Sequence, residues 1–377
     1  MTGGVRHLYV HLPFCARRCG YCDFVTAVGR RDQHEPYVDA LLGELALEGG
    51  LLASPVETVF LGGGTPTFTE PRALERLLHA LPRAEETTVE ANPETVTAEL
   101  AELLRRAGVN RVSLGAQSFQ PRLLAALDRV AGPDTVRRAF YRLRDAGFDN
   151  ISLDLIYGIP GQSPSDVEAD LADALELGPE HLSCYELEAK PGTRFTHAHA
   201  EELACQAEAM EGYFELVVDR LTGAGYRWYE TANFCREAHR SGAGRDLRAR
   251  HNLAYWVGRD YLGLGVGAVS TAGGRRWRNT PRLQRYVESL ERGDRPEREL
   301  EELAPETQRQ ERLMLGLRLD EPLPLDDVAG VVDFAAIPRL QKLGLVRRGS
   351  DREGTETLRL TSRGRRLGGG VTADLLA

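Results

Sequence analysis

The amino-acid sequence predicts an α/β protein with a parallel β-sheet and a small C-terminal α+β domain. Through the first 200 residues, short apolar runs alternate with amphipathic helical segments, as in proteins built from β/α repeats. The chain has 377 residues and is 42% hydrophobic, so it can bury the core of one barrel-sized domain and of a smaller second domain. Beyond about residue 300 the pattern changes to short helical segments and two short apolar runs.

Six apolar runs are the predicted strands, and amphipathic segments between them are the predicted helices. Strands are expected at 8–13, 58–61, 87–91, 111–116, 151–157 and 181–187, and helices at 37–48, 73–81, 98–106, 134–146 and 165–177. Three of the helical segments are followed by Gly108, Gly147 and Gly178, and glycine commonly closes a helix. Six β/α units in this order indicate a full or partial barrel or a doubly wound sheet.

Chemically distinctive residues follow these strands. Three cysteines follow the first strand, and a GGGTPT run at 62–67 follows the second. Glu90 ends the third strand, Gln117 ends the fourth, and Asp154 lies on the fifth. Ligands of parallel sheets bind at the C-terminal ends of the strands. We therefore expect one mouth of the sheet to hold all these residues.

The later part of the chain is expected to form a separate domain. A segment rich in arginine, glycine and aromatic residues spans 226–277. Helices are expected at 313–319, 325–331 and 337–343, and a hairpin at 345–346 and 358–360, which together resemble a winged-helix module. We predict a core barrel at 1–235, a connecting segment at 236–300 and a C-terminal domain at 301–377.

Charge and hydropathy narrow the functional classes. The chain has 47 basic and 56 acidic residues, a net charge of −9, so attraction of the whole chain to nucleic acid or anionic lipid is not expected. Residues 338–367 contain nine basic and three acidic side chains. No group of side chains suited to recognising nucleic-acid bases accompanies them, so a solvent-exposed basic surface is the favoured interpretation. The sequence shows no signal peptide and no long apolar run, so the protein is expected in the cytoplasm. Transient association with a membrane is compatible with this expectation.

Cys15, Cys19 and Cys22 place three thiolates on one short loop, and Gly20 lets the backbone wrap closely around an inorganic core. In a reducing compartment this clustering indicates metal binding. A structural zinc site needs a fourth ligand, for which His11 or Asp23 are the available side chains. A [4Fe–4S] cluster with three protein ligands, and one iron open to an exchangeable ligand, is the favoured interpretation. The other cysteines, at 184, 205 and 235, are expected to be buried small hydrophobes.

A competing cofactor motif occurs late in the chain. The run GLGVGA at 263–268 satisfies a dinucleotide-binding fingerprint, which should open a helix. Residues 270–277 contain two adjacent glycines and no helical apolar period. Close backbone packing is therefore the preferred explanation, and no nicotinamide cofactor is predicted.

The Cys-x3-Cys-x2-Cys loop after a first strand, with an aromatic residue before the last cysteine, resembles the signature of the radical S-adenosylmethionine (SAM) superfamily. The segments 11–15, 62–67, 113–119 and 154–160 are similar to the oxygen-independent coproporphyrinogen III oxidase family and its heme-chaperone relatives. The resemblance spans essentially the whole chain. It implies a partial (β/α)6 barrel and a cluster whose open iron is chelated by SAM. It also implies a SAM site formed by Tyr9, Tyr21, Gly63, Gly64, Thr65, Glu90, Gln117, Arg129 and Asp154.

Two differences favour the heme-chaperone branch, the HemW proteins, over the oxidase. The oxidase has a further cysteine two positions after the third, and this sequence has Phe24 at that position. The oxidase also carries a long N-terminal extension, whereas Cys15 lies near the start of this sequence. The sequence also contains the HNxxYW motif of the heme-binding relatives, as His251, Asn252, Tyr255 and Trp256. A histidine can ligate heme iron, and the aromatic rings offer flat apolar faces. By themselves these residues favour a structural role, in which His251 and Asn252 brace a turn and the aromatic residues pack in the core. Only the resemblance to the family favours heme binding.

Three functional hypotheses follow. The preferred one is a heme chaperone that carries a cluster and exchangeable SAM and delivers heme to an acceptor protein. The alternative is a radical enzyme that decarboxylates coproporphyrinogen III, so enzymatic activity stays open at this point. The third is a nucleic-acid-binding regulator based on the C-terminal module, which would require salt-dependent DNA affinity.

Overall fold

Nine strands form the main sheet, in the order β11-β1-β4-β5-β6-β7-β8-β10-β9. The computed structural model describes residues 4–191, 193–237 and 244–377. The six predicted strands are present as β1 (His7–Leu12), β4 (Val56–Gly63), β5 (Ala84–Ala91), β6 (Arg111–Gln117), β7 (Ile151–Tyr157) and β8 (His181–Glu186). They pair in parallel, and β11 (Leu262–Leu264) extends the sheet beside β1. A hairpin of β9 (Tyr226–Glu230) and β10 (Asn233–Arg236) completes the other edge, with β10 antiparallel to β8.

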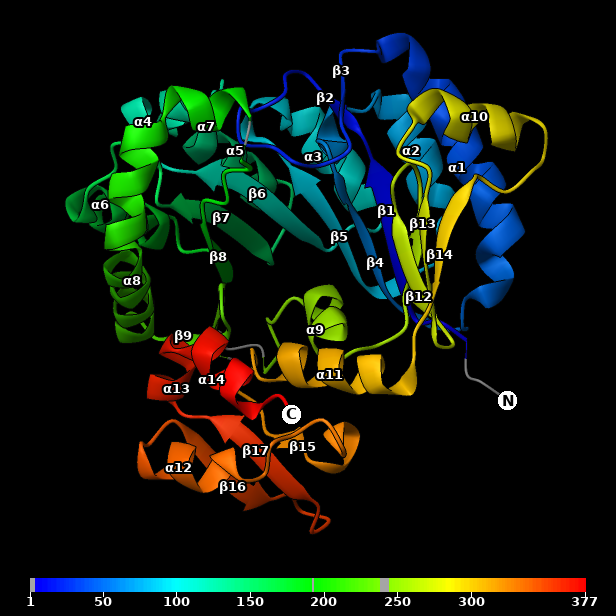
Figure 1. Ribbon diagram of the computed structural model, residues 1–377. Coiled ribbons are helices and arrows are strands. Elements are labelled where there is room, and N and C mark those ends of the chain that lie inside the picture. The colour runs from blue at the N-terminus through cyan, green and yellow to red at the C-terminus, as the bar shows by residue number, and fades with distance from the viewer. Residues whose placement is uncertain (1–3, 192, 238–243) are drawn as a thin grey trace.

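Helices connect the parallel strands. They are α1 (His34–Glu48), α2 (Pro71–Ala80), α3 (Ala98–Arg106), α4 (Pro121–Ala126), α5 (Pro133–Asp145), α6 (Pro164–Leu177), α7 (Arg194–Ala198) and α8 (Ala200–Gly223). Short 3-10 turns occur at η1 (Arg31–Gln33), η2 (Gly49–Leu51), η3 (Pro66–Phe68) and η4 (Pro93–Thr95). In Figure 1, α1, α2, α3 and α5 lie behind the sheet. Alternate side chains of β1 (Leu8, Val10 and Leu12) are fully buried in the core. The predicted parallel α/β architecture is confirmed.

The predicted connecting segment also contributes to the main body. It contains α9 (Arg250–Trp256), β11, β12 (Val269–Ala272), β13 (Arg275–Asn279), α10 (Leu283–Glu291) and β14 (Arg298–Glu302). The last three strands form an antiparallel sheet, and Trp277 and Tyr286 pack into the main core. This segment therefore builds part of the first domain's core.

The glycine run at 263–268 packs closely against other backbone. A Cβ atom at Gly263 would lie 2.1 Å from the carbonyl oxygen of Val269. The Gly265 N–H donates to the buried carboxylate of Glu44 at 2.8 Å, and the strand β12 follows instead of a helix. The expectation of close packing is confirmed, and the fingerprint lacks the helix that a dinucleotide site needs.

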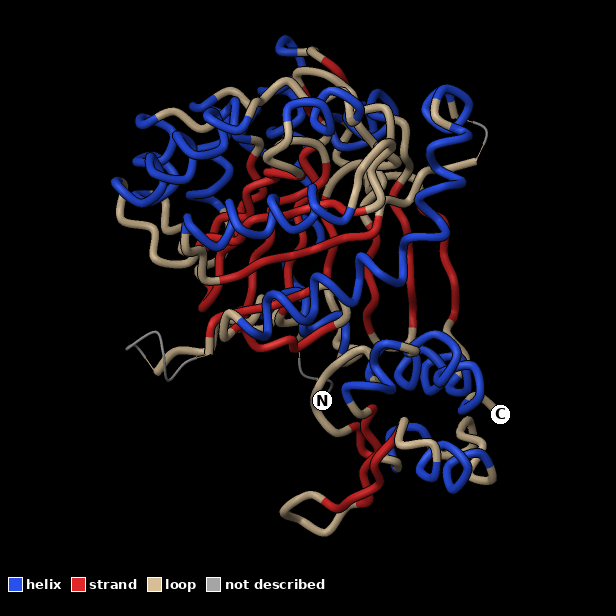
Figure 2. Tube along the Cα trace, turned by 90° about the vertical axis from the view of Figure 1, so that its left-hand side faces the viewer, coloured by secondary structure: helices blue, strands red, loops and turns tan. Residues whose placement is uncertain are grey.

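The C-terminal module has its own core. Its elements are α11 (Pro305–Gly316), β15 (Leu323–Pro324), η5 (Asp326–Val328), α12 (Ala336–Lys342), β16 (Val346–Ser350), β17 (Glu356–Leu360), α13 (Ser362–Arg366) and α14 (Gly368–Leu375). Leu313, Ile337, Leu358 and Leu375 are among its buried side chains. The predicted hairpin is β16–β17, and it projects away from the large sheet in Figure 2. The helix expected at 325–331 is only the single turn η5.

Two further findings concern the remaining surface. Of the three cysteines expected to be buried, Cys184 and Cys235 are, but Cys205 is exposed on α8, so that expectation was wrong. The first half of α8 carries several acidic and alanine residues, and most of its side chains are exposed. No described helix combines the length and apolar character that a membrane crossing requires.

Candidate functional site

The three predicted cluster ligands lie on a loop after β1. Cys15 ends β2 (Phe14–Cys15), which pairs in parallel with β3 (Ala27–Val28). Cys15 is buried, whereas Cys19 and Cys22 are half-buried, and all three are free thiols. A Cβ atom at Gly20 would lie 2.8 Å from the Phe195 ring, so the absence of a side chain lets the loop pack against α7. Among the described residues, no three His, Cys, Asp or Glu side chains are close enough to hold a single metal ion.

The surroundings of the loop suit a cluster held by thiolates. The Thr65 hydroxyl donates to Cys15 Sγ at 3.5 Å, and Arg129 Nη1 donates to Cys19 Sγ at 3.8 Å. Donors to sulfur tune an iron–sulfur cluster. A cavity of about 630 Å³ borders Cys19 and Cys22 between the loop, α4 and α7. Without a metal, burial raises the pKa of the Cys15 thiol. Three free thiols, two donors to sulfur and adjacent space fit the group that the sequence implies.

The glycines of the GGGTPT run bring β4 close to the cysteine loop. The Gly64 N–H donates to the Leu12 carbonyl at 2.8 Å. A Cβ atom at Gly64 would lie 2.6 Å from the Pro13 carbonyl and 3.0 Å from Cys15 Sγ. Gly63 has a φ of 111°, in the region that favours glycine, and its N–H donates to the Glu90 carboxylate at 3.1 Å. These missing side chains make room for the protein's own loop.

Arg129 joins three parts of this region, although it follows the short helix α4. Its Nη2 donates to the Asn92 side chain at 2.8 Å and to the Gly115 carbonyl at 3.0 Å. Asn92 in turn donates to the Thr65 hydroxyl at 2.8 Å. Cys19, Thr65, Asn92 and Arg129 border one small recess. Sequence reasoning missed Asn92, and its position directly after the strand that carries Glu90 was the available signal.

The acidic pair predicted at the strand ends is also assembled. The Asp154 carboxylate accepts hydrogen bonds from the Ser113 hydroxyl, at 3.0 and 3.1 Å, and from the Ser152 hydroxyl at 3.4 Å. Burial, together with the nearby charge of Asp154, raises the pKa of Glu90 to about 8. Burial likewise raises the pKa of Asp154. Two buried carboxyl groups that influence each other's charge are suited to accept hydrogen bonds from hydroxyl or amino groups of a ligand.

The other predicted SAM residues surround this pair. Gln117 lies at an irregularity in the pairing of β6 with β7 and has a φ of 66°, and such bulges redirect side chains. Tyr9 accepts or donates a hydrogen bond with the His11 ring at 3.0 Å. Tyr21 packs edge-on against Phe195. Burial raises the pKa of Tyr21, and the nearby charges of Cys19 and Asp154 raise it further.

The HNxxYW motif forms the short helix α9, whose N-terminus is fixed by the sheet. The Glu86 carboxylate accepts the backbone N–H groups of Arg250 and His251, both at 3.1 Å, which satisfies N–H groups that have no partner within a helix. The Tyr229 hydroxyl accepts the Ala249 N–H at 3.2 Å. The motif is therefore held against β5 and β9.

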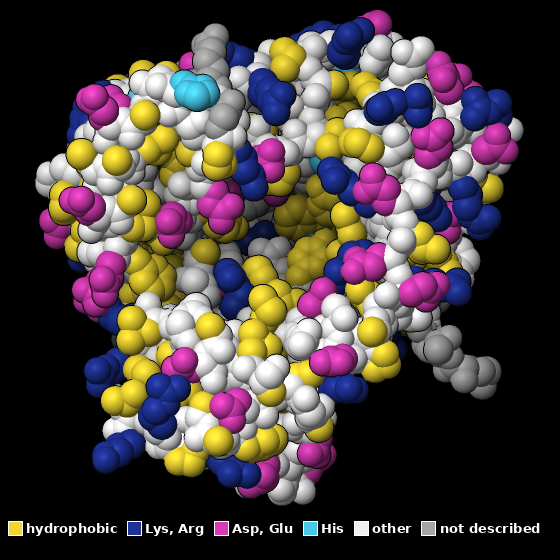
Figure 3. Space-filling model, viewed as in Figure 1, with side chains coloured by type: hydrophobic (Ala, Val, Ile, Leu, Met, Phe, Trp, Pro, Cys, Tyr) yellow, Lys and Arg dark blue, Asp and Glu magenta, His cyan; other side chains and the backbone are white. Residues whose placement is uncertain are grey.

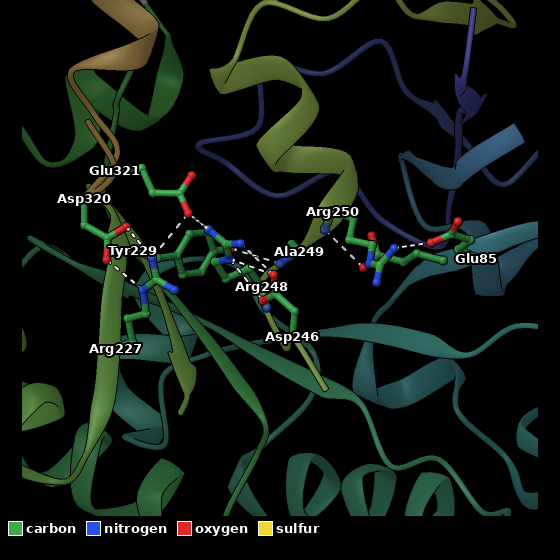
Figure 4. Close-up of polar contacts among 10 residues, drawn as sticks. Glu85, Arg227, Tyr229, Asp246, Arg248, Ala249, Arg250, Asp320 and Glu321 are labelled. Atoms are coloured by element: carbon green, nitrogen blue, oxygen red, sulfur yellow. Dashed lines mark hydrogen bonds and ion pairs between the residues drawn. The ribbon is translucent and has the colours of Figure 1, made fainter. Parts of the chain in front are cut away.

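Charged side chains around α9 connect it to both parts of the molecule (Figure 4). Arg248 pairs with Asp246 at 2.6 Å and with Glu321, which follows α11, at 2.5 Å. Arg250 pairs with Glu85 on β5. On the neighbouring strand β9, Arg227 binds Asp320 at 2.7 Å. This network spans β5, β9 and the chain that leaves α11.

His251 is buried, and both of its ring nitrogens are hydrogen-bonded. Nδ1 lies 2.7 Å from the Thr58 hydroxyl and Nε2 lies 2.9 Å from the Tyr255 hydroxyl. The ring also stacks on Phe60 at 5.1 Å, and burial lowers its pKa to about 3. An axial ligand needs a free imidazole nitrogen, so in this conformation His251 is placed to orient Tyr255.

The remaining residues of the motif are more accessible. Asn252, Tyr255 and Trp256 are half-buried. The Arg318 guanidinium lies 4.5 Å above the Trp256 ring. Phe60 stacks on Tyr9 as well as on His251, so one aromatic side chain separates the predicted SAM residues from the HNxxYW motif. The front of the molecule is hollowed above α9 and α11, and hydrophobic side chains line its depth (Figure 3).

Comparison with known proteins places this arrangement in a family. Residues 9–174 match the Radical SAM superfamily. The heme chaperone HemW of Mycobacterium tuberculosis is 36% identical over 389 aligned residues, which cover 100% of this chain and 96% of that protein. HemW of Escherichia coli is 38% identical over 77% of this chain and 79% of its own length.

A solved structure shares the fold. The radical SAM enzyme coproporphyrinogen III oxidase (HemN) of Escherichia coli superposes with a TM-score of 0.77, at 24% sequence identity, over 99% of this chain and 90% of its own. This likeness shows a common fold for both the sheet and the C-terminal module. Because the sequence similarity to HemW extends over the full length, the chain belongs to the HemW family of heme chaperones within the radical SAM superfamily.

Proposed function

We propose that the chain is a heme chaperone, which binds heme and delivers it to an acceptor protein. The observation that carries the proposal is the similarity to HemW over the whole chain, which includes the helix with the HNxxYW motif. Cys15, Cys19 and Cys22 hold a [4Fe–4S] cluster in this proposal, and the strand ends bind exchangeable SAM. The superfamily match supports both cofactors.

The side chains have distinct roles in this proposal. Glu90 and Asp154 accept hydrogen bonds from the ribose or amino group of SAM, and Gln117 contributes a donor and an acceptor. Arg129 pairs with the SAM carboxylate, which is supported by its buried Nε atom, for which the described residues supply no partner. When bound, the cluster would supply an open iron that SAM can chelate. Thr65 and Arg129 keep the thiolates oriented through their contacts with sulfur.

Tyr255 and Trp256 provide the apolar surface for heme, and His251 is a positioning residue. Its hydrogen bonds to Thr58 and Tyr255 hold the Tyr255 ring in place. This assignment changes the role predicted for His251 in heme binding while keeping the motif in the site. Burying a porphyrin against aromatic rings gives affinity even when the axial ligand is weak.

The alternative function is the decarboxylation of coproporphyrinogen III, and the fold shared with the oxidase favours it. Phe24 argues against it, because this position carries cysteine in the oxidase pattern. The Phe24 side chain is 64% exposed and lies two residues after Cys22. The cluster loop of this chain therefore has no thiol at this position.

A heme titration of the anaerobically reconstituted protein tests the proposal. Wild type should develop a Soret band that saturates, and truncation of both aromatic residues (Tyr255→Ala with Trp256→Ala) should weaken binding by at least tenfold, because two large apolar contacts are lost. Tyr141→Ala is the matched control, since Tyr141 is an exposed aromatic residue on α5. The proposal fails if wild type shows no saturable Soret band.

The cluster assignment is tested on the same preparation. Wild type should contain about four irons and four sulfides per chain, and serine at 15, 19 or 22 should remove the cluster absorbance. SAM should change the EPR spectrum of the reduced cluster, and Asp154→Asn should weaken that response. Retention of iron in all three serine variants would contradict the assignment.

A further inference from the structure

A cavity of about 690 Å³ lies between α9, the turn that joins β12 to β13, α11 and η5. Tyr255 and Trp256 from the HNxxYW helix form part of its wall, and Asp327 from the C-terminal module lines it on another side. The helices α9 and α11 lie side by side in Figure 1, below the hollow that Figure 3 shows on the front face. Pockets of a few hundred to about a thousand Å³ hold drug-sized ligands and cofactors, so this cavity is large enough for a porphyrin edge.

The apolar part of the wall suits a flat ring. Tyr255 meets Tyr261 edge-on, with ring centroids 4.6 Å apart, and both line the cavity together with Leu303, Pro305 and Leu315. Aromatic and aliphatic side chains from α9, α11 and the loops next to them thus face one space. Such walls bind planar apolar ligands through burial of their faces.

The charged part of the wall is unevenly paired. Arg276 is bound by Glu311, with two contacts of 2.9 and 2.6 Å, and Arg312 is bound by Asp327 at 3.2 Å. Arg259 and Arg309 also line the cavity. Within the described ranges, neither of these two guanidinium groups has a carboxylate at ion-pair distance, and the buried Nε atom of Arg309 has no hydrogen-bond partner.

Two uncommitted arginines beside an aromatic wall match the chemistry of heme. Heme is a flat apolar ring that carries two carboxylate groups on one edge. Guanidinium groups bind carboxylates through charge-assisted hydrogen bonds. Burial also lowers the pKa of Arg312, which shows that Asp327 compensates its charge only in part. An anionic ligand would offset this remaining cost.

We propose that this cavity is the heme site, with the ring against Tyr255 and Trp256 and the two carboxylates paired with Arg259 and Arg309. The assignment rests on the proposed chaperone function and adds the groups that recognise the anionic edge. It also places heme in contact with both the main body and the C-terminal module. A loaded chaperone would therefore differ from an empty one at the junction of its two domains.

The test compares ligands that differ only in charge. Reconstituted wild type and the variants Arg259→Gln and Arg309→Gln are titrated with heme, with heme dimethyl ester and with iron-free protoporphyrin IX. Arg282→Gln is the control, because Arg282 is exposed and lies outside the cavity. Each cavity variant should weaken heme and protoporphyrin about tenfold, the usual value of one charge-assisted hydrogen bond. Affinity for the ester, and all affinities of the control, should stay unchanged.

The outcomes separate this proposal from the chaperone function. If wild type binds heme but both arginine variants bind it equally well, the site assignment is overturned and the chaperone function stands. Equal losses for heme and ester would overturn the carboxylate pairing, since they would indicate a general change in the pocket. An effect on heme without an effect on protoporphyrin would also overturn it. Absence of heme binding by wild type would overturn both.

Discussion

Long-range hydrogen bonds determine what single side chains do in this protein. His251 is a helix residue by sequence, yet its partners Thr58 and Tyr255 lie on β4 and one turn further along α9. Its burial lowers the pKa to about 3, so the ring is neutral near pH 7. It behaves as a fixed donor and acceptor that holds Tyr255.

This burial predicts a specific acid sensitivity. The unfolded chain has a histidine pKa of about 6.5, whereas the folded value for His251 is about 3. Below about pH 6.5 the unfolded state binds a proton that the folded state excludes, so the free energy of unfolding decreases as the pH falls toward 3. The measurement is the free energy of unfolding of cluster-free protein, obtained by urea titration at several pH values between 7 and 4.5. Its slope against pH gives the number of protons taken up on unfolding. This number should be close to one lower for His251→Gln than for wild type. Equal pH slopes would contradict the buried, neutral histidine.

At the level of elements, the turn from β4 into η3 sets the position of the cysteine loop. The Gly64 and Thr65 N–H groups donate to the Leu12 and Phe14 carbonyls, each at 2.8 Å. The backbone of β4 is thereby bonded to the chain that leads into Cys15. Close approach requires glycine at 64, because a Cβ atom would meet Pro13 at 2.6 Å.

Gly64→Ala should therefore disturb both stability and cluster retention. The overpacking is expected to cost about 1–3 kcal/mol, and the displaced loop should lower the iron content after reconstitution. Gly50→Ala is the matched control, since a Cβ atom there has no neighbour within 4 Å and should change neither value appreciably. The measurements are urea unfolding and iron per chain. If Gly64→Ala behaves like the control, the turn does not position the loop.

The sequence predicted the β/α elements well because each amphipathic helix and buried strand has a local apolar pattern. It missed α8 as a single long helix, since the first half of α8 is acidic and alanine-rich. Its buried apolar residues (Tyr213, Val217, Val218 and Leu221) lie in the second half. It also missed the β9–β10 hairpin. The partners of Arg129, and the Glu86 carboxylate that caps α9, come from distant strands, and no local pattern signals such contacts.

At the scale of the whole molecule, arginines join the C-terminal module to the main sheet. Arg365 on α13 is only 9% exposed, donates to the Trp228 carbonyl at 2.6 Å and stacks 3.7 Å above the Trp228 ring. Burial lowers its pKa to about 10, so it stays charged at neutral pH. Arg318 adds a pair with the buried Glu230 at 2.7 Å. Both contacts connect the module to β9.

Arg365→Ala should loosen this junction. The loss of a buried charged hydrogen bond and a cation–π contact is expected to cost about 2–4 kcal/mol, and thermal unfolding should separate into two transitions as the module detaches. Arg363→Ala tests the specificity, because Arg363 lies on the same helix but is exposed. One unchanged cooperative transition in Arg365→Ala would show that the two cores are coupled by other contacts.

The assignment as a carrier of heme, in place of an enzyme that consumes a porphyrinogen, is tested most directly by one assay on one sample. Anaerobically reconstituted wild type of known iron content is divided into two portions. One portion is titrated with heme, and the other is incubated with coproporphyrinogen III, SAM and a reductant before the porphyrin products are quantified. We predict stoichiometric heme binding and no conversion to protoporphyrinogen IX above the level given by protein without a cluster. Robust decarboxylation without measurable heme binding would contradict this account and assign the chain to the oxidase reaction.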